Sequence, residues 1–197
     1  NAMRNPARTA VTSAALMIAL ALVVFVSVFA ADLKQSIADS IDGTYRGDIV
    51  VTSSGTGRIP APTVAAIATV RGVAAAGGMQ TDQVRLAGHT ESLVGVDAAV
   101  FPRLWKLAWK DGSDAAFAGL GDDDAVIGSD LAKTRGLALG SRLDVTSRTG
   151  QTAALTVRAI YDAGDSRMAG ILVGADRFRR LSTNGDMDVV LAQTVAG

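Results

Sequence analysis

Few side chains of this sequence have the types and spacing that catalysis or metal binding requires. Cysteine is absent, which excludes disulfides, thiolate metal sites and cysteine nucleophiles. His89 is the only histidine, and it lies between two apolar runs in a position typical of a hairpin turn. A typical zinc site would need further histidine or cysteine ligands. We therefore interpret His89 as a solvated turn residue, with a weak ligand or pH-sensing role as the alternative.

Two other stretches resemble ligand-binding loops only in part. Gly121-Asp122-Asp123-Asp124 lacks the alternating ligands and distal Glu of an EF-hand, so we expect its carboxylates to face water. Ser54-Gly55-Thr56-Gly57 lacks the glycine spacing of a phosphate-binding or dinucleotide-binding loop, which favours a flexible turn. No G-x-S-x-G nucleophile motif accompanies them. We predict no catalytic residue, no metal site and no cofactor in this chain, which makes an extracytoplasmic hydrolase the least favoured function.

The charge composition limits the partners of the chain. Lys and Arg together equal Asp and Glu at 19 each, so no broad basic surface for nucleic acid is expected. The tripeptide Arg46-Gly47-Asp48 matches an adhesion motif, but it leads directly into a predicted strand. We interpret that match as chance.

An apolar segment near the N-terminus determines the organisation of the chain. Thr9 to Ala31 carries no charged residue and is long enough, as a helix, to cross a hydrocarbon core of about 30 Å. We predict a transmembrane helix over residues 4–31. A cleaved signal peptide ending near Val28-Phe29-Ala30 and a buried core helix of a soluble protein are the alternatives. The predicted membrane-anchoring side chains are the large apolar ones of this helix: Leu16, Ile18, Leu20, Leu22, Val23, Phe25, Val26 and Phe29.

The flanking charges predict the orientation of this helix. Arg4 and Arg8 precede the apolar segment and Asp32 follows it, so the N-terminus is expected in the cytoplasm and everything after Asp32 outside it. The predicted location is therefore the cell membrane, with the main domain extracytoplasmic. Asn1 and Ala2, before Met3, resemble a remnant of tag cleavage, so residues 1–3 are excluded from the fold prediction.

A stalk is predicted to connect the membrane helix to a folded domain. Leu33, Ile37 and Ile41 recur at helical spacing over residues 32–43, and Gly43 is a natural helix stop. Gly43 and Gly47 are the candidate hinge at which the following domain, residues 44–197, could rotate.

Mixed helical and strand signals fill residues 44–197 and predict an α+β domain, with several antiparallel hairpins and two subdomains. Local signals are typical of particular elements: Pro62 opens a helix, and Ser129 caps another helix that ends at Gly136. The expected strands are a buried strand 48–53, a hairpin of 84–86 and 93–96 turning at 88–91, and strands at 125–128, 141–147, 152–161, 171–173 and 187–192. A helix is expected at 175–181.

The richest aromatic stretch, from Asp97 to Trp109, contains a proline-constrained helix that Asp97 can cap. We expect its apolar side chains, Phe101, Leu104, Trp105 and Trp109, to pack into a core. A patch that contacts a protein partner is the alternative.

Several phrases, in order, resemble the MacB/FtsX-like permeases of ABC transporters. The N-terminal phrase Arg4-Asn5-Pro6-Ala7-Arg8-Thr9-Ala10 resembles the start of a permease transmembrane segment. Asp48-Ile49-Val50-Val51 resembles the first strand of the extracytoplasmic domain, and Arg71-Gly72-Val73 resembles its next turn. The clearest phrase runs from Val126-Ile127-Gly128-Ser129-Asp130-Leu131-Ala132 through Gly136-Leu137 and Leu139-Gly140-Ser141 to Thr156-Val157-Arg158-Ala159-Ile160. Ser141 and Arg71 depart from the Asp and Pro that the family often has.

The resemblance implies a permease subunit with a MacB-like extracytoplasmic core domain between two transmembrane helices. It also implies a separate or fused ABC ATPase subunit, which would bind the ATP, and two permease copies as a homodimer or a pair. An extracytoplasmic protein partner is a further implied contact. A single-anchor binding or sensing module without a transport role is the alternative function.

Overall fold

The computed structural model describes residues 6–44, 46–53, 57–162 and 170–195. Residues 1–43 form one compact unit and residues 44–197 a second one. The predicted tag remnant at residues 1–3 and most of the predicted glycine-rich turn, residues 54–56, lie outside the described residues.

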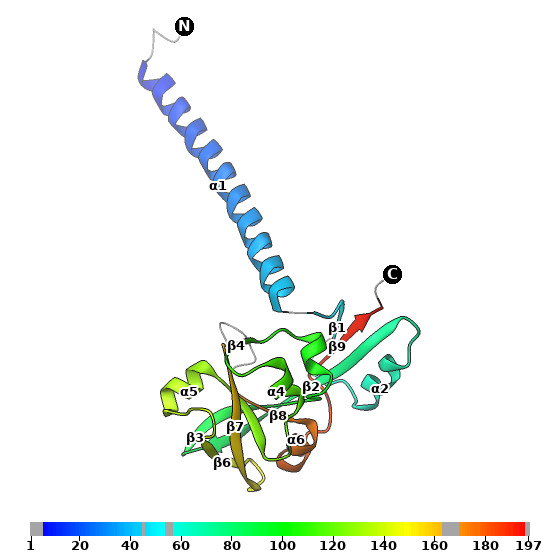
Figure 1. Ribbon diagram of the computed structural model, residues 1–197. Helices are drawn as coiled ribbons and strands as arrows, with labels where there is room; N and C mark the ends of the chain where they lie inside the picture. The colour runs from blue at the N-terminus through cyan, green and yellow to red at the C-terminus, as the bar shows by residue number, and fades with distance from the viewer. Residues whose placement is uncertain (1–5, 45, 54–56, 163–169, 196–197) are drawn as a thin grey trace. The chain divides into compact units, whose positions relative to one another are not determined.

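The first unit is formed by the long helix α1, Pro6–Thr44, drawn in blue in Figure 1. One continuous helix runs through residues 6–43 of the predicted membrane and stalk ranges and ends at Thr44, one residue beyond the predicted stop at Gly43. The side chains of the predicted stalk residues 33–43 lie outside the described set. Within the described residues, no helix meets both the length and the hydropathy of a membrane span. The predicted span over residues 4–31 is therefore not confirmed.

The second unit contains short helices and strands in alternation, as predicted for an α+β domain. Its helices are α2 (Pro62–Ala68), α3 (Phe101–Leu104), α4 (Asp114–Ala118), α5 (Ser129–Arg135) and α6 (Ala175–Leu181). Its strands are β1 (Ile49–Thr52), β2 (Val73–Leu86), β3 (His89–Val96), β4 (Ala108–Asp111), β5 (Asp124–Gly128), β6 (Arg142–Ser147), β7 (Thr152–Asp162), β8 (Ile171–Gly174) and β9 (Val189–Thr194).

The described strands form one mixed sheet, which closes on itself over part of its length. The order is β1-β9-β2-β3-β8-β5-β7-β4, and β6 pairs with both β2 and β7. The strands β2, β3, β8, β5, β7 and β6 therefore form a closed ring, a small barrel. Parallel pairs within it join β3 to β8 and β5 to β7.

The interior of the barrel is filled by one apolar cluster. Every strand of the ring contributes to it, for example Leu93 from β3, Ile127 from β5 and Leu155 from β7, all fully buried. Helices α5 and α6 add Leu131 and Phe178 to the same cluster. Because a closed ring has inward and outward positions in alternation, the intervening residues face the other way.

The outward face of the barrel is covered by the aromatic stretch that the sequence singled out. Val94, Val126 and Leu172 project outward from three neighbouring strands and pack in a second cluster. That cluster also contains Phe101, Leu104, Trp105 and Phe117, from α3, α4 and the chain beside them. The predicted core role of this stretch is confirmed for Phe101, Leu104 and Trp105, which are buried, while Trp109 is half-buried.

Strands β1 and β9 form an arm beside the barrel with the first half of β2, while β4 pairs with β7 at the other end of the sheet. β1 pairs antiparallel with β9, which pairs antiparallel with the first half of β2. Figure 1 shows β9, in red, beside β1. The prediction of a buried first strand is wrong: β1 is an edge strand, and Ile49 and Val50 are 42% and 47% exposed. A β-branched run signals a strand, but its burial depends on what covers the strand.

The predicted division into two subdomains is also wrong, because residues 44–197 form one compact unit. The physical reason is the length of β2. Its first half pairs with β9 in the arm and its second half pairs with β3 and β6 in the barrel, so one strand belongs to both parts.

Several local predictions need small corrections. The hairpin of β2 and β3 is confirmed, but its turn is formed by Ala87 and Gly88, both with positive φ, and His89 already pairs with Leu86. Ser129 was predicted to cap α5, but Gly128 occupies the cap position and the Ser129 hydroxyl donates to Asp162 instead. Gly136 ends that helix in the left-handed conformation, as predicted. The last strand, predicted at 187–192, is β9 over residues 189–194.

Candidate functional site

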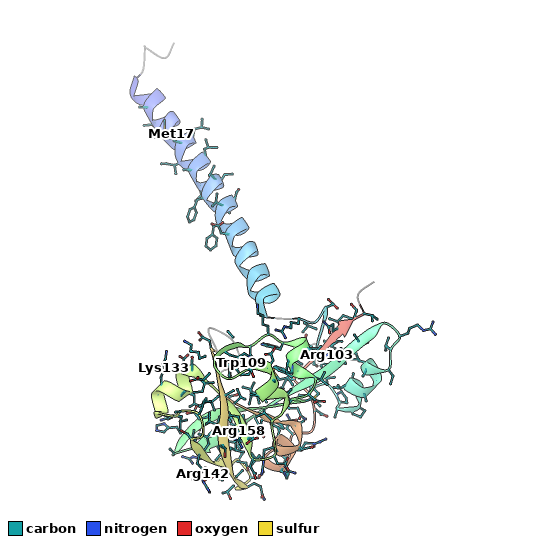
Figure 2. All side chains as sticks on the ribbon, in the orientation of Figure 1. Met17, Arg103, Trp109, Lys133, Arg142 and Arg158 are labelled. Atoms are coloured by element: carbon teal, nitrogen blue, oxygen red, sulfur yellow. The ribbon has the colours of Figure 1, made fainter. Side chains whose placement is uncertain are left out.

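The predicted anchor residues lie on α1 and are exposed. Their exposed fractions range from 54% for Val26 to 73% for Leu16. Figure 2 shows apolar side chains, Met17 among them, projecting from different sides of the helix. Leu16, Ile18, Leu20, Leu22, Val23, Phe25, Val26 and Phe29 are all in this exposed set.

The predicted hinge glycines have different surroundings. Gly43 lies inside the last turn of α1. Gly47 lies in the second unit, in the short connector of residues 46–48 that precedes β1. A Cβ atom at residue 47 would lie 2.8 Å from the carbonyl oxygen of Ala192, so the absence of a side chain allows the connector to approach β9 closely. The hinge itself stays a prediction.

Arg46 fixes the connector to the two short helices on the outer face of the barrel. Its backbone N–H donates to the Leu104 carbonyl at 2.9 Å. Its guanidinium donates to the Pro102 carbonyl at 2.6 Å and to the Asp114 carboxylate at 3.0 Å. We call these three hydrogen bonds the Arg46 clamp.

Asp114 is itself held in place by the helix that it begins. It is the first residue of α4, where a negative charge is favourable, and the Ser113 hydroxyl accepts from the Ala116 N–H. The other carboxylate oxygen of Asp114 accepts from the indole N–H of Trp109 at 2.8 Å. One carboxylate therefore joins the connector to β4 and α4.

Asp48 fixes the other end of the connector to β9. Its carboxylate accepts from the Thr194 backbone N–H at 2.8 Å and from the Thr194 hydroxyl at 2.6 Å. The hydroxyl bond, and after it the backbone bond, lowers the pKa of Asp48 below its ordinary value of 3.8, because both donors favour the ionised carboxylate. The Asp48 N–H also donates to the Ala192 carbonyl at 3.0 Å.

These contacts bring the two ends of the domain together. Because β1 and β9 are antiparallel, the connector before β1 lies beside the end of β9 at Thr194. The chain therefore enters and leaves the domain at one place. Only Gly47 of this site was singled out as functional from the sequence; Arg46, Asp48 and Asp114 carried no motif beyond the tripeptide that we interpreted as chance.

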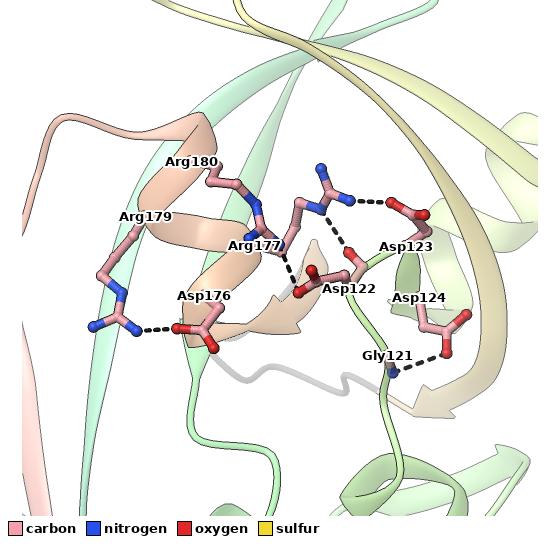
Figure 3. Close-up of polar contacts among 8 residues, drawn as sticks. All are labelled: Gly121, Asp122, Asp123, Asp124, Asp176, Arg177, Arg179 and Arg180. Atoms are coloured by element: carbon pink, nitrogen blue, oxygen red, sulfur yellow. Dashed lines mark hydrogen bonds and ion pairs between the residues drawn. The ribbon is translucent and has the colours of Figure 1, made fainter.

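The carboxylates of the acidic cluster at residues 121–124 pair with arginine side chains. Figure 3 shows Asp122 beside Arg180, and Asp123 beside Arg177. Asp124 accepts from the Gly121 N–H at 2.9 Å and pairs with Arg158 at 2.7 Å. Across the described ranges, no group of three His, Cys, Asp or Glu side chains is arranged to hold a metal ion. The expectation that these carboxylates face water holds for Asp122 and Asp123, whose side chains are 61% and 74% exposed, but not for Asp124, at 16%; all three also pair with arginines of α6 or β7.

A comparison with protein families decides the assignment of the chain. Residues 9–196 match the model of the MacB-like periplasmic core domain. The chain belongs to this family. No protein of curated function matches the sequence.

Solved structures with the same fold agree with the assignment to MacB-like periplasmic core domains. A domain described as that of a permease protein from Porphyromonas gingivalis superposes with a TM-score of 0.53 and 18% identity, over 71% of this chain and 64% of that one. The periplasmic region of MacB from Actinobacillus actinomycetemcomitans gives 0.50 and 10%, over 74% and 72%. The extracellular domain of the noncanonic ABC-type transporter YknZ from Gram-positive bacteria gives 0.51 and 16%, over 75% and 83%.

At sequence identities of 10–18%, these superpositions show a shared fold. The predicted resemblance to MacB-like domains is confirmed by the family match, which includes most of the apolar part of α1. The chain spans less than two thirds of the P. gingivalis domain, at 64%.

Proposed function

We propose that this chain is part of the permease subunit of an ABC transporter, and that its domain couples ATP-driven movement of membrane helices to export or to an extracytoplasmic partner. The observation that carries this proposal is the match of residues 9–196 to the MacB-like periplasmic core domain. The domain then lies outside the cytoplasm, as the solved neighbours do in their proteins.

In this proposal α1 anchors the domain in the cell membrane. Support comes from the exposure of its large apolar side chains between Leu16 and Phe29, which water solvates poorly. The absence of charge from Thr9 to Ala31 is a second support. Arg4 and Arg8 would lie on the cytoplasmic side.

ATP would be bound by a separate or fused ABC ATPase, with two permease copies in the assembly, as a homodimer or a pair. The sequence has no phosphate-binding motif of its own that could replace such a partner. The work of the domain is then mechanical and requires no catalytic residue in this chain. An extracytoplasmic protein is a further partner of the proposal.

The coupling is proposed to pass through residues 43–48. A continuous helix transmits a displacement along its axis, and α1 continues to within two residues of Arg46. Support comes from the contacts of the connector. They join it to α3 and α4 on one side and to β9 on the other, so a displaced α1 could act on both.

Membrane topology tests the proposal directly, because the chain has no cysteine that would interfere with labelling. Two single-cysteine variants are used: Thr90→Cys, in the exposed β2–β3 hairpin, and Ala7→Cys, before the apolar segment. We expect a membrane-impermeant maleimide to label residue 90 in intact cells, and residue 7 only after lysis. Labelling of both residues only after lysis would contradict an extracytoplasmic domain.

Coupling to an ATPase is tested in the full-length protein with its ATPase subunit. Gly43→Pro removes a helical hydrogen bond and kinks the last turn of α1, whereas Gly43→Ala keeps the helix. We expect Gly43→Pro to separate ATP hydrolysis from the outward function and Gly43→Ala to retain their coupling. If no ATPase copurifies and no second apolar segment follows, the single-anchor binding module replaces this proposal.

A further inference from the structure

The connector is bound to the domain at two places, by the Arg46 clamp and by Asp48, whose carboxylate accepts from the Thr194 N–H and hydroxyl and whose N–H donates to the Ala192 carbonyl. The Arg46 clamp joins it to α3 and α4 through three hydrogen bonds, two of them from the guanidinium. Behind the clamp, β1 pairs with β9 over only the four residues from Ile49 to Thr52. Gln193 adds one long contact to the Arg46 carbonyl at 3.4 Å.

Because α1 precedes β1 in the chain, a displacement of α1 reaches the β1–β9 pair at one end first. The hydrogen bonds at that end are then the first to be loaded. The end of β1 nearest to α1 is the end at Asp48, whose N–H donates to Ala192. β1 is also an edge strand with exposed apolar side chains, so little packing opposes its separation from β9.

The Arg46 clamp lies between α1 and that first ladder bond. A displacement of α1 therefore acts on the clamp before it acts on the Asp48 N–H. The groups that accept the Arg46 hydrogen bonds belong to a well-packed part of the domain: Phe101 and Leu104 of α3 and Phe117 of α4 are 4%, 0% and 0% exposed. They pack against Val126 and Leu172 on the barrel wall.

We propose that the Arg46 clamp keeps β1 paired with β9 when α1 is displaced, so that the displacement reaches α3, α4 and the barrel wall instead of separating the edge strand. Its role under displacement rests on the proposed permease function. The clamp itself is a property of this chain and can be tested without a transporter.

The effect of the Arg46 clamp on the pairing of β1 with β9 can be measured by amide hydrogen exchange of the full chain. Arg46→Gln removes the charge and shortens the reach to Pro102 and Asp114, so the amides of residues 48–52 should exchange about two- to tenfold faster. Exchange in the barrel strand β8 should not change. The matched control is Arg180→Gln, since Arg180 of α6 has a comparable exposure, 51% against 42%, and pairs with Asp122, which is neither in the clamp nor in the β1–β9 pair.

A second variant keeps the test decisive if Arg46→Gln folds poorly. Asp114→Asn retains an oxygen for the Trp109 indole N–H but removes the carboxylate charge that pairs with Arg46. We expect faster exchange at residues 48–52 and a shifted Trp109 indole resonance, whereas the Trp105 indole should shift less.

The proposal is overturned if the amides of residues 48–52 exchange at the wild-type rate in both Arg46→Gln and Asp114→Asn. It is equally overturned if Arg180→Gln accelerates their exchange as much as Arg46→Gln. Either result would leave the permease assignment intact, because that assignment rests on the family match and on topology. Conversely, if the cysteine of Thr90→Cys were found in the cytoplasm, the proposed permease function would be wrong, but the exchange result for the clamp would be unchanged.

Discussion

The barrel and the arm of this domain are built from the same aliphatic residues, but the barrel buries them and the arm leaves many exposed. Ile127 in barrel strand β5 is 0% exposed, whereas Ile49 in arm strand β1 is 42% exposed. The strands of the barrel each have two neighbours in the ring, whereas β1 has a neighbour on one side. Pairing on both sides, and not composition, therefore determines which aliphatic side chains are buried.

The two parts of the domain also differ in their packing and in the path of the chain. The barrel and the helices on its outer face form a packed body with apolar side chains inside and outside its wall. The arm carries the connector, the close approach at Gly47 and the end of β9, so the chain enters and leaves through the less buried part.

The largest expected effect compares the same substitution in both parts. Ile127→Ala leaves a cavity inside the barrel and should lower the free energy of unfolding by about 2–5 kcal/mol. Ile49→Ala removes atoms that are already partly in water and should cost about 1 kcal/mol or less. Urea denaturation of both variants measures the comparison, and equal losses would contradict it.

A smaller effect is expected at the close approach in the arm. Gly47→Ala places a Cβ atom against the Ala192 carbonyl, so the connector must move away from β9, at a cost of about 1–3 kcal/mol. Gly185→Ala is the control, because no atom lies within 4 Å of its Cβ position. Thermal unfolding should show a lower midpoint for Gly47→Ala alone; a Gly47→Ala midpoint equal to wild type would show that the arm adapts freely.

Loss of an ion pair should also lower the free energy of unfolding more in the packed part of the domain than in the arm. Arg177, with a side chain 16% exposed, donates to the Asp122 carbonyl and pairs with Asp123, so Arg177→Gln should cost about 1–2 kcal/mol. Arg58, in the arm, is 40% exposed and should cost about 0.5 kcal/mol or less as Arg58→Gln. Chemical denaturation of the two variants checks the order, and a larger loss for Arg58→Gln would reverse it.

The smallest effect is a pH dependence confined to the arm. The pKa of Asp48 is below 3.8, because the ionised carboxylate accepts from Thr194. Its stabilising contribution is therefore present above the ordinary pKa and is lost as the pH falls through the lowered value. The Thr194 amide resonance should titrate with a midpoint below 3.8 in the wild type and lose this transition in Asp48→Asn. A midpoint at or above 3.8 would count against the hydrogen-bonded carboxylate.

Short-range signals predicted the helices and hairpins well because each depends on neighbouring residues. Pro62 begins α2, Gly136 ends α5 with a left-handed conformation, and the polar turn between Ser147 and Thr152 joins β6 to β7. The same signals misplaced the burial of β1 and the cap of α5. In both cases the outcome depended on groups distant in the sequence, namely what covers β1 and the Asp162 carboxylate that the Ser129 hydroxyl contacts.

The sequence by itself determined that an uncharged apolar helix precedes an α+β domain without cysteine, because composition and periodicity act within one element at a time. Only the tertiary structure decided that β6 closes a barrel between β2 and β7 and that Arg46 reaches Asp114. These contacts join residues that are far apart along the chain. A pattern within one element does not specify which distant element it will meet.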